Sequence, residues 1–489
     1  MQAIPFDNSY ATLPERFYRR VSPSPVQAPS LIRVNRPLAT YLQVDPDLLA
    51  SATGVEIVAG NRVPEGADPI AMAYAGHQFG QFNPQLGDGR AILLGEVLAS
   101  DGQRHDLQLK GSGVTPWSRG GDGRAPLGPV IREYVVSEAM AALGVPTSRA
   151  LAAVTTGEPV FRERPLPGGV LLRVARSHIR VGTFEYFAAR QDEEALRLLV
   201  EHVLARHYPE RVGAAVPATA LLEGVSERQA DLIAQWMHLG FIHGVMNTDN
   251  MLVSGETIDY GPCAFMDTYD PETVFSSIDR GGRYAYKNQP VIAQFDLACL
   301  ARAVLPLLKD EAQVQQAQDL LDGFPKRYKT AFEGRLTQKL GLSARQPNDC
   351  QLKSDFLGAL EADQADFTLA FRHLTDLADP PAPDSTVAGL FKPGPALAAW
   401  IPRWQARLQQ DPLAPSARGI QMRATNPALI PRNHLVEAAI RAAEDQADLS
   451  PFHALTEALN TPYRYDGSLE HFARPPRPEE QVLKTFCGT

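Results

Sequence analysis

The chain has 489 residues, of which 44% are hydrophobic and 21% charged, which is enough apolar material for a large core in two or more packed lobes. Its 47 basic and 56 acidic side chains give a net charge of -9, which argues against non-specific binding to nucleic acid or to an anionic membrane. The four cysteines are too few and too scattered for a disulfide framework or a paired zinc motif, and this indicates a reducing compartment.

The N-terminal part of the chain is predicted to form an extended arm. Residues 1–80 are rich in Pro, Ser and Ala and show little sustained periodicity, so no independent domain is expected there. Residues 1–20 include Asp7 and Glu15 and lack an apolar segment, which predicts neither a secretory signal nor an Arg-rich transit peptide. No apolar run in the chain reaches the roughly 18 residues of a membrane span, so no membrane partner is expected.

A small strand-rich lobe is predicted over residues 81–185. Apolar segments at 90–98 and 105–110 flank an Asp-Gly turn, a pattern typical of a β-hairpin. The second of these strands ends at Lys110.

A glycine- and arginine-rich loop, residues 111–128, follows this hairpin. The apolar periodicity of 129–143 then predicts a helix that stops at Gly144. Two further apolar runs, 148–155 and 169–175, are flanked by Gly and Pro and predict strands.

A larger helical lobe is predicted over residues 186–424. Helical patterns cover 192–208 and 226–240, and the second has Ser226 as its expected N-cap and Gly240 at its end. Helices separated by proline-rich joints continue to the end of this lobe.

Between these helices lies the segment with the most polar residues. A loop at 243–250 leads into a short predicted hairpin at 251–259. Helices predicted at 433–447 and 451–459 belong to a C-terminal tail, residues 425–489.

The order of polar residues along these elements is that of a protein kinase. Lys110 ends a strand, Glu133 lies in the next helix, and Asn250 and Asp259 flank the predicted hairpin, with Asp259-Tyr-Gly standing where kinases have Asp-Phe-Gly. Phosphoryl and nucleotidyl transfer need cations for the phosphates and acidic or amide ligands for a metal ion. We therefore expect an α+β, protein-kinase-like bilobal fold, with a small strand-rich N-lobe, a larger helical C-lobe, and N- and C-terminal extensions.

The catalytic loop departs from the kinase pattern at one position. The kinase base lies five residues before the metal-binding asparagine, and here that position is Val245. A valine cannot accept a proton, so phosphate transfer by the usual route is not available. Asp249, next to Asn250, is the nearest replacement base; the alternative is that it only caps or hydrogen-bonds the loop.

Two glycine-rich turns are candidates for holding a nucleotide. Gly87, Gly89 and Arg90 precede the first strand, where a tight turn exposes backbone N–H groups beside a cationic side chain. Asp122 and Gly123 belong to a second such loop, before the helix that carries Glu133. Either motif alone is ordinarily just a turn.

Arginines are concentrated between residues 161 and 190. Six of them lie there against two glutamates, which in an acidic chain predicts a local polyanion site. Arg173 and Arg180 are the two expected to contact phosphates, and Arg162, Arg164, Arg176 and Arg190 are expected on the surface.

Four strings of residues resemble the selenoprotein O family, also called the YdiU family. They are Gly87-Asp-Gly-Arg90, the stretch from Lys110 to Arg124, His243-Gly-Val-Met-Asn-Thr-Asp-Asn250, and Asp259-Tyr-Gly-Pro. The resemblance covers nearly the whole chain. It implies a protein adenylyltransferase with a pseudokinase fold, in which ATP lies flipped so that its α-phosphate faces the acceptor hydroxyl.

The resemblance also implies a role for each candidate residue. Lys110 pairs with Glu133, Asn250 and Asp259 bind Mg²⁺ or Mn²⁺, and Asp249 accepts the proton of a Ser, Thr or Tyr hydroxyl on a protein substrate. The residues implied to hold ATP are Gly87, Gly89, Arg90, Lys110, Asp122, Gly123, Arg173, Arg180 and, with the metal, Asp259.

The tail of the chain raises the expectation of redox control. Family members often end near a selenocysteine or cysteine, and this chain has Cys487. Where the resemblance implies a partner cysteine, the chain has Ser276 and Ser277, so an internal disulfide is in doubt. Cys263 is a possible substitute for that partner, although a buried structural thiol is the favoured interpretation of Cys263. The lack of a transit peptide predicts a bacterial, cytoplasmic member.

Three functions remain open from the sequence. Adenylyl transfer is favoured, with UMP transfer as a variant of the same chemistry. An atypical protein kinase would need a base other than Val245, and an inert nucleotide-binding scaffold would have little use for Asn250 and Asp259 as metal ligands.

Overall fold

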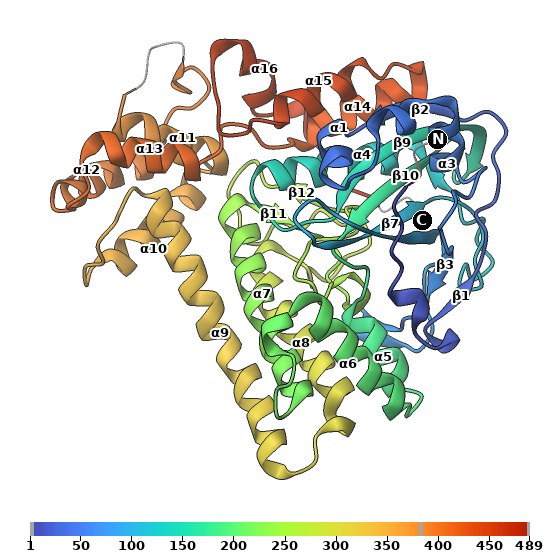
Figure 1. Ribbon diagram of the computed structural model, residues 1–489. Coiled ribbons are helices and arrows are strands. Elements are labelled where there is room, and N and C mark those ends of the chain that lie inside the picture. The colour runs from blue at the N-terminus through green and yellow to red at the C-terminus, as the bar shows by residue number, and fades with distance from the viewer. Residues whose placement is uncertain (1–3, 381–384, 487–489) are drawn as a thin grey trace.

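The protein is described here by a computed structural model that covers residues 4–380 and 385–486 (Figure 1). It is an α+β protein, in which, over these residues, an eight-stranded antiparallel sheet is followed in the chain by many helices. The strands of the sheet lie in the order β1-β3-β6-β7-β10-β9-β2, and β8 pairs with β10. Their bounds are β1 Tyr18–Arg20, β2 Ser30–Val34, β3 Ile70–Met72, β6 Ala91–Leu98, β7 Arg104–Lys110, β8 Ala125–Pro126, β9 Arg149–Phe161 and β10 Pro165–Ala175.

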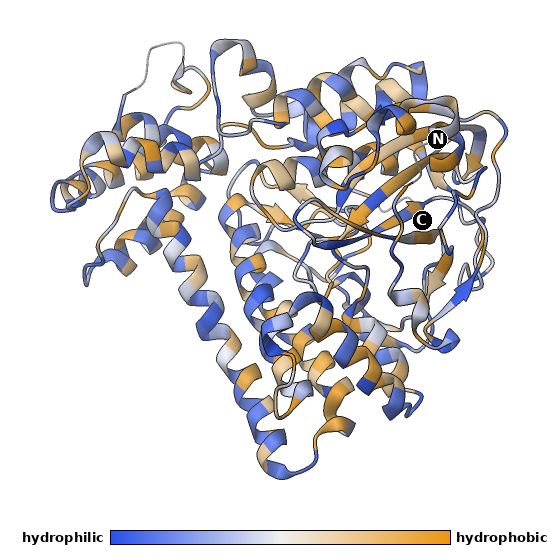
Figure 2. Ribbon diagram, in the orientation of Figure 1, coloured by the Kyte–Doolittle hydropathy of each residue, from blue (hydrophilic) through white to orange (hydrophobic). Residues whose placement is uncertain are grey.

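The central strands are buried on both faces because helices cover each side of the sheet. On β10, Leu171 belongs to the same core as Val130 of helix α4 (Leu127–Ala142). Its neighbours Val170 and Leu172 point the other way and join a second core, together with Ile57 of α3. Helices α1 (Arg36–Tyr41), α2 (Pro46–Ala50) and α3 (Ala52–Ala59) cover that second face. Figure 2 shows the strands mainly in the hydrophobic colour.

The predicted hairpin and the helix after it are confirmed. β6 and β7 pair from Ala91 opposite Lys110 to Leu98 opposite Arg104. β9 and β10 are longer than predicted, because both continue past the apolar core into a hairpin that ends at Phe161 and Pro165. The first 80 residues add β1, β2 and β3 to the same sheet.

Helices dominate after the sheet. Their bounds are α5 Val181–Ala188, α6 Glu193–His207, α7 Pro217–Leu239, α8 Gln289–Val304, α9 Glu311–Lys339, α10 Asp349–Ala362, α11 Phe367–Ala378, α12 Pro395–Gln409, α13 Pro415–Thr425, α14 Asn433–Gln446, α15 Ser450–Leu459 and α16 Glu470–Ala473. The long helix α9 packs along α7 (Figure 1). The predicted tail helices are confirmed as α14 and α15, and they return from the end of the chain to pack on α4.

Two local predictions are wrong. α7 begins at Pro217, so Ser226 is buried inside the helix and is not its N-cap, while Gly240 ends the helix as predicted, at φ +73°. The hairpin expected at 251–259 does not form. Leu252 instead bridges Arg180, and Thr257 bridges Thr147. The backbone of this segment is satisfied by pairing with distant parts of the chain, which local composition cannot reveal.

A two-stranded pair frames the catalytic loop in place of that hairpin. β11 (Phe241–Ile242) lies before the loop and pairs with β12 (Ala264–Phe265) after it. The residues from 243 to 263 therefore form one loop, and the paired strands β11 and β12 hold its two ends side by side.

One described segment, Tyr286–Leu307, has the length and composition of a membrane-crossing helix, and half of its apolar window is buried inside the molecule. This burial is typical of the core helix of a globular protein, since the apolar side chains already contact other elements.

The cysteines differ in their surroundings. Cys263 is buried, and its thiol donates to the carbonyl of Tyr260 at 3.3 Å. Ser276 forms a bridge with Thr485, so the tail reaches the segment that follows Asp259-Tyr-Gly. Cys487, the predicted redox-active residue, lies outside the described residues.

Candidate active site

A cleft of about 510 Å³ opens between the sheet and the catalytic loop. All twelve residues selected from the sequence line it: Gly87, Gly89, Arg90, Lys110, Asp122, Gly123, Glu133, Arg173, Arg180, Asp249, Asn250 and Asp259. They come from β7, α4, β10, the N-terminus of α5, two glycine-rich turns and the loop between β11 and β12. The fold therefore gathers into one cavity residues that are spread from position 87 to position 259 of the chain.

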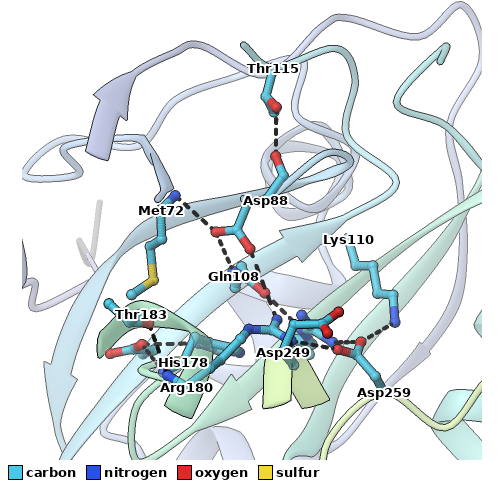
Figure 3. Close-up of polar contacts among 12 residues, drawn as sticks. Met72, Asp88, Gln108, Lys110, Thr115, His178, Arg180, Thr183, Asp249 and Asp259 are labelled. Carbon is cyan, nitrogen blue, oxygen red and sulfur yellow. Dashed lines mark hydrogen bonds and ion pairs between the residues drawn. The ribbon is translucent and has the colours of Figure 1, made fainter. Parts of the chain in front are cut away.

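The centre of the cleft is a charge network around Asp259 (Figure 3). Lys110 Nζ lies 2.5 Å from Glu133 Oε2 and 2.7 Å from Asp259 Oδ1. Arg173 donates to the same two carboxylates, at 3.1 Å and 2.7 Å. Arg180 reaches the other oxygen of Asp259 at 2.8 Å. Three cations thus converge on a single carboxylate from three different elements.

The backbone and the charge of Asp259 both reflect this position. Its φ is +63°, a left-handed conformation that non-glycine residues rarely adopt and that is often found at functional sites. Burial by itself would raise the pKa of Asp259, but Lys110, Arg173 and Arg180 hold that pKa well below its ordinary value. The carboxylate is therefore ionised at any physiological pH.

Asp249 has a different environment in the same cleft. Its Oδ2 accepts a hydrogen bond from the Gln78 amide at 3.1 Å, and its backbone carbonyl accepts from Arg180. Oδ1 is buried and has no hydrogen-bond partner within the described part of the chain. Burial raises the pKa of Asp249 to about 6, although Arg180 opposes the rise.

Close packing of glycines fixes the loop that carries Asp249. A Cβ atom on Gly76 would lie 2.6 Å from Asp249 Oδ1, and one on Gly182 would overlap the carbonyl of Ala75. The backbone of two neighbouring segments can therefore approach the catalytic loop more closely than side chains would permit.

Several residues of the cleft were missed by sequence reasoning. Asp88 is 2% exposed and accepts hydrogen bonds from the Met72 N–H at 3.0 Å and from Gln108 at 3.2 Å. Arg180 lies 4.0 Å from the other Asp88 oxygen and stacks over the ring of Tyr74. The sequence signal was present, because Asp88 stands between the two glycines of the first turn.

The second glycine-rich loop is closed by an ion pair that was also missed. Asp122 receives two hydrogen bonds from Arg162, at 2.8 Å and 3.1 Å, and Arg162 lowers the pKa of Asp122. Arg162 was expected on the surface but lines the cleft. In contrast, Arg164 pairs with Asp445 away from the cleft, and Arg190 packs over the ring of Tyr186.

The oxygen donors in the cleft fit a divalent cation. Asn250 donates its side-chain amide to the carbonyl of Val245 at 3.0 Å, which fixes the side chain through its nitrogen. Its oxygen and the Asp259 carboxylate form a set of hard oxygen ligands in one cavity. Such a set suits Mg²⁺ or Mn²⁺ better than softer metals.

Known proteins are similar to this chain over nearly its whole length. A family profile described as "Protein adenylyltransferase SelO" matches residues 1–460. The protein nucleotidyltransferase YdiU of Rhodopseudomonas palustris (strain BisB5) is 61% identical over 488 residues, 99% of each chain. The protein of the same name from Bradyrhizobium diazoefficiens is 57% identical over 488 residues, again 99% of each chain. The chain therefore belongs to the SelO family of protein adenylyltransferases.

Proposed function

We propose that this protein is a nucleotidyltransferase that moves AMP from ATP to Ser, Thr or Tyr hydroxyls of protein substrates, and that the cleft around Asp259 is its active site. The observation that carries the proposal is the combination of kinase-like charged groups with Val245 at the position of the kinase base. The nearest carboxylate that can take a proton, Asp249, lies in the same cavity. Family membership supports adenylyl transfer over phosphoryl transfer.

Each residue then has a defined task. Lys110, Arg173 and Arg180 neutralise the phosphates, and Glu133 orients Lys110 and Arg173 by accepting from both. Asn250 and Asp259 hold Mg²⁺ or Mn²⁺, which when bound supplies positive charge at the phosphates. Asp249 orients the acceptor hydroxyl and takes its proton as the oxygen attacks the α-phosphorus and pyrophosphate leaves.

The glycine-rich turns complete the nucleotide site in this proposal. Gly87, Gly89 and Arg90 would contact ATP on one side of the cleft, and Asp122 and Gly123 on the other. The Arg162–Asp122 ion pair supports this assignment, because it holds the second loop against the cavity.

We also propose the kinase-like bilobal arrangement, with an N-terminal arm over 1–80, an N-lobe over 81–185, a C-lobe over 186–424 and a tail over 425–489. The sheet, which ends at Ala175, and the helices that follow support the division between the lobes. A bacterial cytoplasmic location and protein rather than nucleic-acid substrates complete the proposal, and the net charge of -9 supports the second point.

The test uses ATP labelled separately at the α- and γ-phosphates. The purified full chain, beside Asp259→Ala, is incubated with each label and Mg²⁺ or Mn²⁺, with itself and a bacterial lysate as acceptors, and the labelled proteins are identified by mass. Transfer of AMP from the α label alone, lost in the variant, is the expected result. Label from the γ-phosphate would make the protein a kinase, no label would make it a scaffold, and UTP in place of ATP tests UMP transfer.

A further inference from the structure

A second group of metal-binding residues lies behind the catalytic loop. His77 comes from β4 (Gly76–Gln78), Glu185 from α5 and Cys299 from α8. One ligand atom from each of the three lies within 4.8 Å of the others. These residues are outside the lining of the nucleotide cleft and have no task in the proposed reaction.

The contacts of Glu185 connect this group to the active site. One carboxylate oxygen of Glu185 contacts the His77 ring, and the other accepts a hydrogen bond from the Thr248 hydroxyl. The backbone N–H of His77 donates to the same hydroxyl at 2.6 Å. Thr248 immediately precedes Asp249, so the group fixes the residue beside the proposed proton acceptor.

A fourth side chain provides an independent sign of a ligand. Asp296 is completely buried, and neither of its oxygens has a hydrogen-bond partner among residues 4–380 and 385–486. It lies on the same face of α8 as Cys299, three residues earlier, and just outside the group of three whose ligand atoms lie within 4.8 Å of one another. Glu185 and Asp296 are both close enough to raise the pKa of the Cys299 thiol, after the larger effect of burial.

Burial of this many acidic groups is unfavourable without compensation. A buried polar group that makes no hydrogen bond destabilises the folded chain, and two neighbouring carboxylates add repulsion. Arg283 is the basic residue whose charge acts on Asp296, and it also lies over the ring of Phe295. A divalent cation among these ligands would satisfy the oxygens of Asp296 and neutralise the pair.

The ligand chemistry selects the cation. One imidazole, one thiol and two carboxylates are nitrogen, sulfur and oxygen donors, a mixture typical of zinc. Around a tetrahedral zinc ion with bonds of about 2.0–2.3 Å, ligand atoms lie roughly 3.5 Å apart. His77 and Glu185, which contact each other directly, would move apart to admit the ion, and Cys299 would move toward it. His77 is partly exposed, whereas Glu185 and Cys299 are buried.

We propose that His77, Glu185 and Cys299 bind a zinc ion that is separate from the nucleotide-bound cation, and that the Asp296 carboxylate, one turn before Cys299 on α8, moves in as the fourth ligand. The ion holds β4, α5 and α8 together, and through Glu185 it positions Thr248. The Cys299 thiol releases its proton to solvent when the ion binds.

Metal analysis of the purified full chain tests this proposal. Wild type, Cys350→Ala and Asp259→Ala are each expected to carry about one zinc per chain, and Cys299→Ala is expected to lose it. Cys350→Ala is the matched control, because Cys350 is exposed and is not a member of the group. Asp259→Ala removes a proposed ligand of the nucleotide site, so its zinc content separates the two sites.

Cobalt substitution gives a readout in which the wild type alone can overturn the proposal. Wild type and Cys350→Ala loaded with Co²⁺ are expected to show a thiolate-to-cobalt charge-transfer band, and His77→Ala and Cys299→Ala are expected to lack it. A wild type that carries no zinc and gives no such band with excess Co²⁺ overturns the proposal, and Asp296 is then a protonated buried acid. A band that persists in Cys299→Ala also overturns it.

Discussion

At the scale of single residues, Asp249 and Asp259 show how two carboxylates in one cleft acquire different tasks. Asp259 is contacted by Lys110, Arg173 and Arg180, so it stays charged and can act as a ligand. Asp249 has an amide neighbour on one oxygen, and its second oxygen is buried and has no hydrogen-bond partner in the described structure. The difference lies in the cations around each group, a pattern common in enzymes that pair two acids.

Replacing Asp249 by Asn is expected to lower the rate of AMP transfer by about 10²–10⁴-fold, because the amide keeps the shape of the side chain but cannot accept a proton. ATP affinity is expected to change little. Single-turnover transfer from α-labelled ATP and a separate binding titration measure the two effects.

Glu163→Gln serves as the control for this change, since Glu163 is an exposed acid outside the cleft lining. If Asp249→Asn instead weakened ATP binding as strongly as it slowed transfer, Asp249 would be a ligand of the nucleotide or metal and not the proton acceptor.

At the scale of elements, two glycines of the loop 111–124 allow the effect of close packing to be measured separately from the effect of backbone strain. Gly123 and Gly120 both have positive φ, +66° and +79°. A Cβ on Gly123 would overlap the backbone of Gly113, whereas one on Gly120 would meet no described atom within 4 Å. Only the first position holds the loop against the nucleotide cleft by close approach.

Gly123→Ala is therefore expected to raise the KM for ATP by about tenfold or more, an effect of displacing a positioning loop. Gly120→Ala is expected to cost only the left-handed strain of an alanine, about 1–2 kcal/mol at most, with the KM unchanged. Steady-state kinetics and thermal unfolding of both variants distinguish these effects. Equal KM values for the two variants would show that the close contact with Gly113 does not position the nucleotide.

Elements whose signals are local could be predicted from the sequence. The β6–β7 hairpin and α4 follow from apolar periodicity and a turn, so Lys110 and Glu133 were assigned to the elements they occupy. The segment 251–259 could not be predicted, because its partners are Arg180 and Thr147, which are remote in sequence.

The residues of the candidate site also divide into those that the sequence predicts and those that it does not. Positions fixed by a spaced motif were found, and all of them line the cleft. Arg162 was missed, since its place depends on its partner Asp122, which only the folded chain brings near. Asp88 was missed although it stands inside the first glycine-rich motif. A count of charges along the sequence cannot tell such an arginine from one on the surface.

At the scale of the whole molecule, the end of the chain supports the helix that carries Glu133. Pro126, the residue immediately before α4, makes no side-chain hydrogen bond that would cap the helix. Glu444 of α14 instead accepts from the Gly128 N–H at 2.9 Å, so an acid from the tail caps the helix N-terminus.

Glu444→Ala is expected to lower the free energy of unfolding by about 1–2 kcal/mol through loss of this cap. Asp445→Ala is the matched control on the same helix, because Asp445 is more exposed and pairs only with surface arginines in the described structure. Urea unfolding of both variants gives the comparison. Equal destabilisation by both would mean that the effect comes from surface ion pairs.

The pH dependence of folding provides a second test at this scale. Glu256 is buried, and burial raises the pKa of its carboxyl from 4.5 to about 7, although Ser254 and the Arg176 N–H donate to it. The native state holds this proton more tightly than the unfolded chain does. Stability is therefore highest below the unfolded pKa and falls as pH rises toward 7.

Glu256→Gln is expected to be more stable than wild type at pH 8, by on the order of 2 kcal/mol, and similar to it at pH 4.5. Unfolding in urea at the two pH values measures the difference, with Glu163→Gln as an exposed control. A difference between Glu256→Gln and wild type that is the same at both pH values would show that Glu256 does not titrate as described.

The three cations around Asp259 have a consequence for the binding equilibria of the cleft. Without ligands, Lys110, Arg173 and Arg180 are counter-ions of the carboxylate that is proposed to bind metal. Phosphates that draw these cations away free Asp259 for Mn²⁺, and Mn²⁺ on Asp259 frees the cations for phosphates. Nucleotide and metal should then show positive thermodynamic linkage, each raising the affinity of the other by the same factor. Titrations of ATP with and without Mn²⁺ measure that factor, and additive binding would mean that the counter-ions do not exchange.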